Sequence, residues 1–214
     1  MRYIKLFEGF QSKSKVAQFC LEYNIRDWSI NSEGLVDVNG DVKLYNSGLN
    51  KIPIKFGKII GYFDCSNNEL KSLEGCPHTV VGDFDCSNNE LKSLEGCTHT
   101  VGAGFYCSGN QLTSLEGSPE SIGGDFYCES NQITSFDGCP KKVDGDFYCY
   151  NNPVHSIWRL FRSVNNNEWD YQVIELFMDY DCIRGKDLII DRFNDFLIEI
   201  GKDSVKKVKG YNNI

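Results

Sequence analysis

Basic residues, long apolar stretches and histidine are scarce in this sequence of 214 residues. It contains 22 Lys and Arg against 30 Asp and Glu, which gives a formal net charge of -8. A chain of this sign is poorly suited to binding nucleic-acid phosphates or an anionic membrane. No stretch approaches the roughly 18 apolar residues of a membrane span, and residues 1–10 lack the apolar core of a signal peptide. We therefore expect a cytoplasmic protein with a basic partner and no direct contact with membranes or nucleic acids.

The motifs that carry common chemistries are also missing. The sequence has no Cys-x-x-Cys pair, no phosphate-binding G-x-x-x-x-G-K-[ST] loop and no candidate catalytic triad. Cys76-Pro77-His78 and Cys97-Thr98-His99 suggest a metal site, but the Cys-x-His pattern is lost in the next two repeats. We expect no enzymatic activity, no cofactor and no metal ion.

What the sequence does contain is an internal repeat. The unit F-x-C-x-x-N-x-L-x-x-L recurs every 21 residues, and its five cysteines are Cys65, Cys86, Cys107, Cys128 and Cys149. A degenerate copy lies one period upstream, with Val42, Leu44, Leu49 and Ile52 at the apolar positions and Ser47 in place of the Asn. Because equal spacing of apolar positions indicates stacked structural units, the sequence predicts about six rungs.

The unit resembles the L-x-L-x-x-N-x-L core of leucine-rich repeats, with Phe and Cys in the first two Leu positions. Its Ser-Leu-Glu-Gly-Cys-Pro stretch, and the flanks at Asp37–Asp41 and Asp191–Gly201, resemble short leucine-rich-repeat proteins of bacteria and tailed bacteriophages. The resemblance implies an α/β repeat fold: a leucine-rich-repeat solenoid with one parallel sheet on its concave face, little convex helix, and helical caps. It implies almost nothing about activity. The sequence departs from the usual leucine-rich-repeat consensus in one respect. The apolar residue before each strand, such as Val80 or Ile122, lies one position earlier than the consensus places it.

The repeat positions have physical explanations. Residues at i and i+2 of a strand point to the same side, so Phe and Cys should form core columns along the stack. Cysteine suits such a column because it is small and behaves as a buried hydrophobe. The repeated asparagine follows the strand, where its amide can pair with backbone groups that the turn leaves unpaired. We interpret the ten cysteines as thiols and the asparagines as structural.

The flanks predict caps, since the end rungs of a solenoid would otherwise expose the core. Residues 1–41 should form an N-terminal cap, with a helix over Ser12–Tyr23 and a hairpin over Trp28–Val38. Residues 42–157 should form the solenoid. Residues 158–214 should form a C-terminal helical cap, preceded by a short helix over Val154–Phe161. Helical stripes are expected in two segments, Glu168–Tyr180 and Lys186–Ile200. This helical pair is also compatible with an effector-binding or dimerising unit.

The outward face of the predicted strands carries the candidate functional residues. Between 61 and 152 the chain has 14 acidic and 4 basic residues, so the acidity belongs to the repeats. The candidate partner-binding residues are Tyr62, Asp64, Asp83, Asp85, Tyr106, Asp125, Tyr127, Glu129, Asp146, Tyr148 and Tyr150. Tyrosine is common at interface hot spots, and carboxylates favour a Lys- or Arg-rich partner. The alternative is that the tyrosines only stabilise the sheet by stacking between strands.

These observations lead to a hypothesis of function. We expect a non-enzymatic module that holds a basic surface of another protein. By analogy with the phage proteins, that partner is a host protein, and the role is inhibition of an antiviral defence component. The alternatives are a structural or virion-assembly protein and an acidic mimic of nucleic acid. The sequence leaves the oligomeric state open and favours a monomer.

Overall fold

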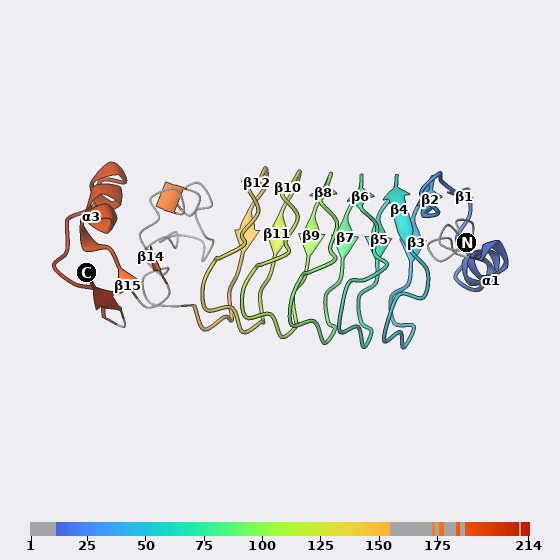
Figure 1. The fold of residues 1–214 in the computed structure, drawn as a ribbon, viewed down its shortest axis with the longest axis horizontal. Helices are drawn as coiled ribbons and strands as arrows, with labels where there is room; N and C mark the ends of the chain where they lie inside the picture. The colour runs from blue at the N-terminus through green and yellow to red at the C-terminus, as the bar shows by residue number, and fades with distance from the viewer. Residues whose placement is uncertain (1–11, 155–172, 174–175, 178–182, 185–186, 210) are drawn as a thin grey trace, which may run out of the picture.

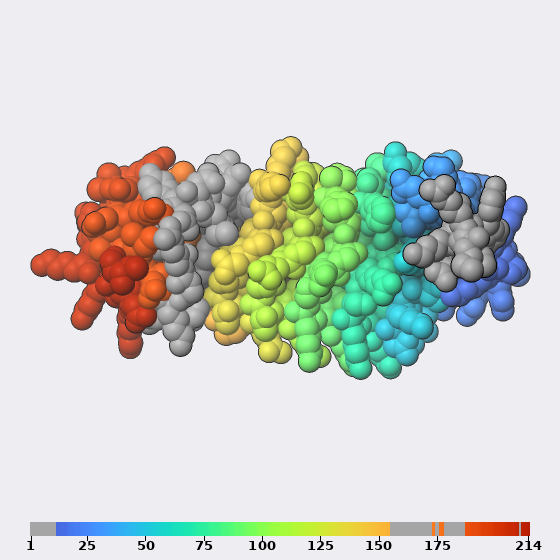
Figure 2. Space-filling view, in the orientation of Figure 1, coloured from blue at the N-terminus to red at the C-terminus, as the bar shows by residue number. Residues whose placement is uncertain are grey.

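The computed structural model describes residues 12–154, 173, 176–177, 183–184, 187–209 and 211–214. The middle of the chain is a solenoid of short parallel strands whose rungs stack along the long axis of an elongated molecule (Figure 1). In the space-filling view the rungs form adjacent bands along this axis (Figure 2). The predicted repeat solenoid is confirmed.

The Phe-x-Cys strands form a six-stranded parallel sheet, which we call sheet 1. Its strands are β3 (Val42–Lys43), β5 (Phe63–Asp64), β7 (Phe84–Asp85), β9 (Phe105–Tyr106), β11 (Phe126–Tyr127) and β13 (Phe147–Tyr148). Each strand pairs with the residues 21 positions away, so that Phe84 lies opposite Phe63 and Phe105. The degenerate first copy is a true rung, because β3 pairs with β5 in the same register.

A second sheet, which we call sheet 2, corrects the expectation of a single parallel sheet. Its strands are β1 (Trp28–Ile30), β2 (Val36–Val38), β4 (Phe56–Ile59), β6 (Thr79–Val80), β8 (Thr100–Val101), β10 (Ser121–Ile122) and β12 (Lys142–Val143). The displaced apolar residue of each repeat is the inward residue of these strands, and Val80, Val101 and Ile122 are at most 2% exposed. The early position of that residue was the signal for a second strand.

Glycine makes the corner between the two sheets possible. A Cβ added at Gly82 would lie 2.8 Å from the carbonyl oxygen of Gly61 in the preceding rung. Backbone atoms cannot yield at such a distance without separating the rungs. The close stacking therefore favours a minimal side chain at this corner, where the equivalent positions of the other rungs carry Gly61, Ala103, Gly124 and Gly145.

The core consists of the predicted columns. Phe63, Phe84, Phe105, Phe126 and Phe147 are at most 1% exposed, and their ring centroids follow one another at 5.4, 5.5, 5.5 and 5.1 Å. The five Phe-x-Cys cysteines are equally buried. Each rung therefore covers the apolar side chains of the next, as a repeat unit that cannot bury its own face requires.

The asparagine column closes the turn after each strand. Asn110 donates from Nδ2 to the carbonyls of Cys107 and, one rung earlier, Cys86, at 3.0 and 3.1 Å. Its Oδ1 accepts the N–H of Leu91 at 3.0 Å. The other repeat asparagines make the same kind of contacts: Asn68, Asn89, Asn131 and Asn152. The prediction that this column is structural is therefore confirmed.

The N-terminal flank forms the elements that the sequence predicts. Helix α1 spans Lys13–Glu22 and buries Val16, Phe19 and Cys20. The ring of Phe19 packs edge-on against Phe56, with centroids 6.4 Å apart. Strands β1 and β2 form the expected antiparallel hairpin, and β2 continues into sheet 2 by pairing in parallel with β4.

The C-terminal flank differs from expectation. Helix α3 spans Ile190–Glu199, four residues later than the predicted start at Lys186. Before it lie β14 (Ile183–Arg184) and β15 (Asp187–Leu188), which pair antiparallel; β16 (Asn212–Asn213) pairs in parallel with β15. A helix period cannot reveal this pairing, because it joins residues 25 apart in sequence. The helix predicted over Val154–Phe161, and most of the one over Glu168–Tyr180, lie outside the described residues.

Candidate functional site

The outward face of sheet 1 brings the predicted site residues together. All eleven are partly or fully exposed, and they follow the rungs from β5 to the residues after β13. The face has two halves. An acidic half over β5 and β7 contains Asp64, Asp83 and Asp85, and a tyrosine half covers β9, β11 and β13.

The tyrosine half is a stacked ladder. Tyr106 and Tyr127 have centroids 4.8 Å apart with an interplanar angle of 9°, and Tyr127 and Tyr148 are 4.5 Å apart at 13°. The hydroxyls of Tyr127 and Tyr148 donate to the carboxylates of Asp125 and Asp146, each at 3.1 Å. Because the rings cover one another's faces, the ladder presents ring edges and phenolic oxygens to a partner.

Gly104 permits the first ring of this ladder to lie flat on the sheet. A Cβ at Gly104 would lie 2.7 Å from the hydroxyl oxygen of Tyr106. The corresponding positions in the next two rungs carry Asp125 and Asp146, which bond to the tyrosines beside them. Burial raises the pKa of Tyr106, and the charges of Asp83, Asp125 and Asp85 raise it further. Tyr106 therefore stays a neutral hydrogen-bonding group at physiological pH.

Some aspartates on this face also hold the rungs together. Asp83 accepts the N–H of Gly104 at 2.7 Å, and Asp125 accepts the N–H of Asp146 at 2.8 Å. Asp41 does the same for Tyr62 at 3.3 Å. This structural role of the aspartates was not predicted from the sequence. Its signal was present in the recurrence of aspartate at one repeat position.

The acidic half brings like charges into register. Asp64 lies directly opposite Asp85 in neighbouring strands. Burial raises the pKa of Asp85, the hydrogen bonds from Ser87 oppose this rise, and the charges of Asp64 and Asp83 add smaller contributions in the same direction as burial. The salt bridges in the described part of the chain join Lys71 to Glu90, Lys141 to Glu120 and Lys142 to Asp144. None reaches the acidic half, so its charge is available to a cation from outside.

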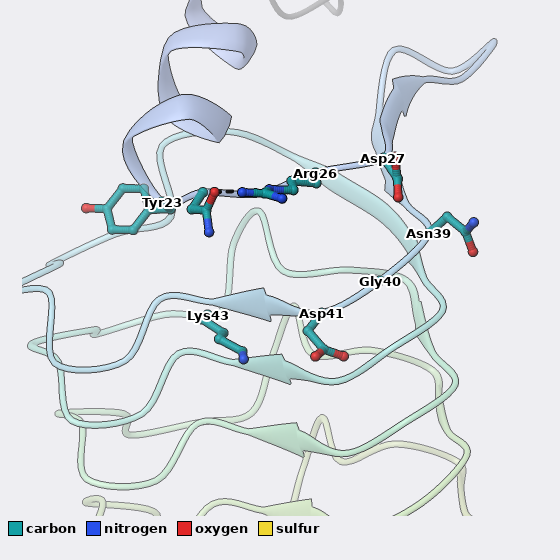
Figure 3. Close-up of a pocket in the computed structure, with 8 residues that line it drawn as sticks. Tyr23, Arg26, Asp27, Asn39, Gly40, Asp41 and Lys43 are labelled. Atoms are coloured by element: carbon teal, nitrogen blue, oxygen red, sulfur yellow. Dashed lines mark hydrogen bonds between the residues drawn. The ribbon is translucent and has the colours of Figure 1, made fainter.

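The N-terminal edge of the face supplies its own cation. The Nζ atom of Lys43 lies 5.3 Å from the ring centroid of Tyr62, within the range of a cation–π contact. Lys43 also lines a shallow depression beneath α1, together with Tyr23, Arg26 and Asp41 (Figure 3). Arg26 bonds to Asn24 there at 3.2 Å. The arrangement shows that an ammonium group fits against a tyrosine of this face.

The far edge carries Glu129 and Tyr150. The charge of Glu129 is the main cause of the raised pKa of Tyr150, whose side chain is 42% exposed. The Oε2 atom of Glu129 is buried without a hydrogen-bond partner in the structure.

The cysteines are placed for packing. Burial raises the pKa values of the Cys86, Cys107 and Cys128 thiols well above their ordinary value, so little thiolate forms at neutral pH. Within the described residues, no group of three or more His, Cys, Asp and Glu side chains is placed to hold a metal ion. His78 and His99 lie side by side with ring centroids 6.5 Å apart, as equivalent positions of adjacent rungs.

We expect these thiols to resist alkylation. In the native protein, iodoacetamide should label Cys86, Cys107 and Cys128 at least about a hundredfold more slowly than in the denatured chain, because labelling requires opening of the rung. Peptide mass spectrometry after timed labelling measures this for each site. A thiol among the three that reacts as fast as in denaturant contradicts the assignment and reopens the question of catalysis.

No protein-family model, no curated protein and no solved structure matches the chain. No helix among the described residues combines the length and apolar character that crossing a membrane requires.

Proposed function

We propose that this protein is a non-enzymatic binding module of the leucine-rich-repeat type, whose sheet 1 face holds a basic surface of another protein. The observation that carries the proposal is the stacked ladder of Tyr106, Tyr127 and Tyr148 beside aspartates that form no salt bridge with a described residue, all on one outward face. Tyrosines give contact area at low entropy cost, and the aspartates select a cationic partner.

We propose that α1 and the C-terminal elements cap the solenoid, and that the protein acts in a reducing cytoplasm, where its thiols persist. The resemblance to phage repeat proteins supports a host protein as the partner, with inhibition of a defence component as the result. A partner that DNA displaces would instead support a nucleic-acid mimic.

Binding of a fluorescent oligo-arginine peptide tests the face. We expect two variants to weaken binding by about tenfold or more, a typical effect of removing interface hot spots. One is Asp64→Asn/Asp83→Asn/Asp85→Asn, which removes three charges and keeps the amide-accepting oxygens. The other is Tyr106→Ala/Tyr127→Ala, which leaves the net charge unchanged. Fluorescence anisotropy at about 0.15 M salt measures the affinities.

The matched control is Glu74→Gln/Glu95→Gln/Glu116→Gln, which removes the same number of charges from exposed turn positions. Its affinity should stay within about twofold of wild type. An equal loss in the control and in the aspartate variant would mean that the peptide responds to net charge alone. That result would exclude the sheet 1 face as a specific site.

A further inference from the structure

The C-terminal part of the molecule presents a loop rich in lysine. After α3, residues 202–209 form what we call the lysine loop, in which Lys202, Lys206 and Lys207 are exposed. None of these three lysines makes a salt bridge within the described residues. The loop thus carries cationic groups that are available to a partner.

This loop has a defined conformation. The Asn194 side chain of α3 accepts the N–H of Val205 at 2.8 Å and donates to its carbonyl at 3.1 Å. The Asn213 side chain of β16 accepts the N–H of Val208 at 2.6 Å and donates to the carbonyl of Val208 at 3.2 Å. Two side-chain amides therefore fix the segment on either side of Lys206 and Lys207. Fixing the loop before contact reduces the entropy that binding would cost.

The loop and the acidic half of sheet 1 are complementary in charge but separated in one molecule. Figure 1 places α3 and β15 at one end of the long axis, while β5 and β7 lie across the solenoid toward the other. Lys206 and Lys207 therefore cannot reach Asp64 and Asp85 of the same copy. A contact between these charges would therefore need a second copy.

We propose that the lysine loop of one copy docks on the acidic half of the sheet 1 face of a second copy. This docking rests on the proposed function of that face as a receptor for basic groups. The occupant is the lysine loop of a second copy. The contact joins two different surfaces, so it is heterologous and can repeat from copy to copy. A foreign basic partner would compete with it for Asp64, Asp83 and Asp85.

The association should be weak and sensitive to salt. It joins exposed lysines to the exposed Asp83 and the half-buried Asp64 and Asp85, and the net charge of -8 makes copies repel one another at longer range. At about 0.01 M salt the charges interact over about 30 Å, and at about 0.15 M over about 8 Å. We expect the attraction between the lysine loop and the acidic half, which acts at contact distance, to exceed this repulsion at low salt and to be screened at the higher salt. The result would be a concentration-dependent series of oligomers at low salt and a monomer at the higher salt.

Sedimentation velocity over a concentration series tests this proposal. Lys206→Glu/Lys207→Glu and Asp64→Lys/Asp85→Lys should each weaken association by about tenfold or more. Lysine is compatible with the second pair of positions, because Lys43 occupies the same column in the first rung. Mixing the two variants should restore association, since the reversed charges again attract. Lys13→Glu/Lys15→Glu, at exposed positions of α1, is the matched control and should associate like wild type.

Two results would overturn the proposal: a wild-type protein that stays monomeric at low salt, or a lysine-loop variant that associates as strongly as wild type. A control that weakens association as much as the lysine-loop variant would overturn it too. The oligo-arginine assay separates this failure from that of the proposed function. If the aspartate and tyrosine variants still weaken peptide binding while the wild-type protein stays monomeric, only self-association is excluded.

Discussion

Phe105→Ala should lower the free energy of unfolding by about 3–5 kcal/mol, the largest effect that we expect from a single substitution. Phe105 is fully buried, and its ring lies between Phe84 and Phe126, with centroids 5.5 Å from each. The alanine would leave a cavity in the middle of the phenylalanine column. Because each rung contacts only its neighbours, the loss also uncouples the two halves of the stack.

Urea denaturation followed by circular dichroism measures this loss. Phe105→Leu is the control, since it keeps most of the volume and should cost less than about 2 kcal/mol. Uncoupled halves would unfold in two steps, so a broadened or biphasic transition is expected for the alanine variant. A loss below about 1 kcal/mol for Phe105→Ala would mean that the column does not hold the rungs together.

Asn110→Ala should lower the free energy of unfolding by about 3 kcal/mol. The substitution leaves the N–H of Leu91 and the carbonyls of Cys86 and Cys107 without their side-chain partner. Each buried polar group left unpaired costs about 1–3 kcal/mol, and entry of water reduces the sum. Asn110 is 7% exposed, so such water would have few routes in. Gln132→Ala, at an exposed position, should change stability by less than about 0.5 kcal/mol.

Asn110→Asp distinguishes hydrogen bonding from packing. The introduced carboxyl keeps an oxygen for the N–H of Leu91 but, when ionised, turns another toward the carbonyls of Cys86 and Cys107. Burial and these carbonyls should raise its folded pKa above the unfolded value of about 3.9. A raised folded pKa stabilises the protein below the unfolded value, and this contribution is lost as pH rises through the folded value. The stability of this variant relative to wild type should therefore fall from pH 4 to pH 7, roughly. A pH-independent difference between the two proteins would contradict the hydrogen-bonding role.

The repeat determined much of the fold because its period is strict. Phe, Cys, Asn and Leu recur every 21 residues, and the structure pairs the strands at that spacing. The helix and hairpin of the N-terminal flank also follow from local patterns. The second sheet was missed because two-residue strands such as Thr79–Val80 are too short for an alternating pattern to reveal.

The C-terminal flank shows the limit of local patterns more clearly. Apolar spacing predicted a helix from Lys186, yet Asp187 and Leu188 pair with Asn212 and Asn213 from the end of the chain. Pairing across such a sequence distance depends on tertiary packing rather than on the segment's own preference.

The sequence predicted which residues make up the candidate site, and the structure showed how their side chains stack and hydrogen-bond. The periodicity identified which tyrosines and carboxylates point outward. Only the three-dimensional arrangement decided that Tyr106, Tyr127 and Tyr148 stack face to face and that Asp83 and Asp125 also bond to the next rung. The scarcity of basic residues predicts that a partner carries positive charge. The fold decided which carboxylates form no salt bridge with a described residue, because strand register brings Asp64 opposite Asp85 while α3 and the segment after it lie at the end of the long axis.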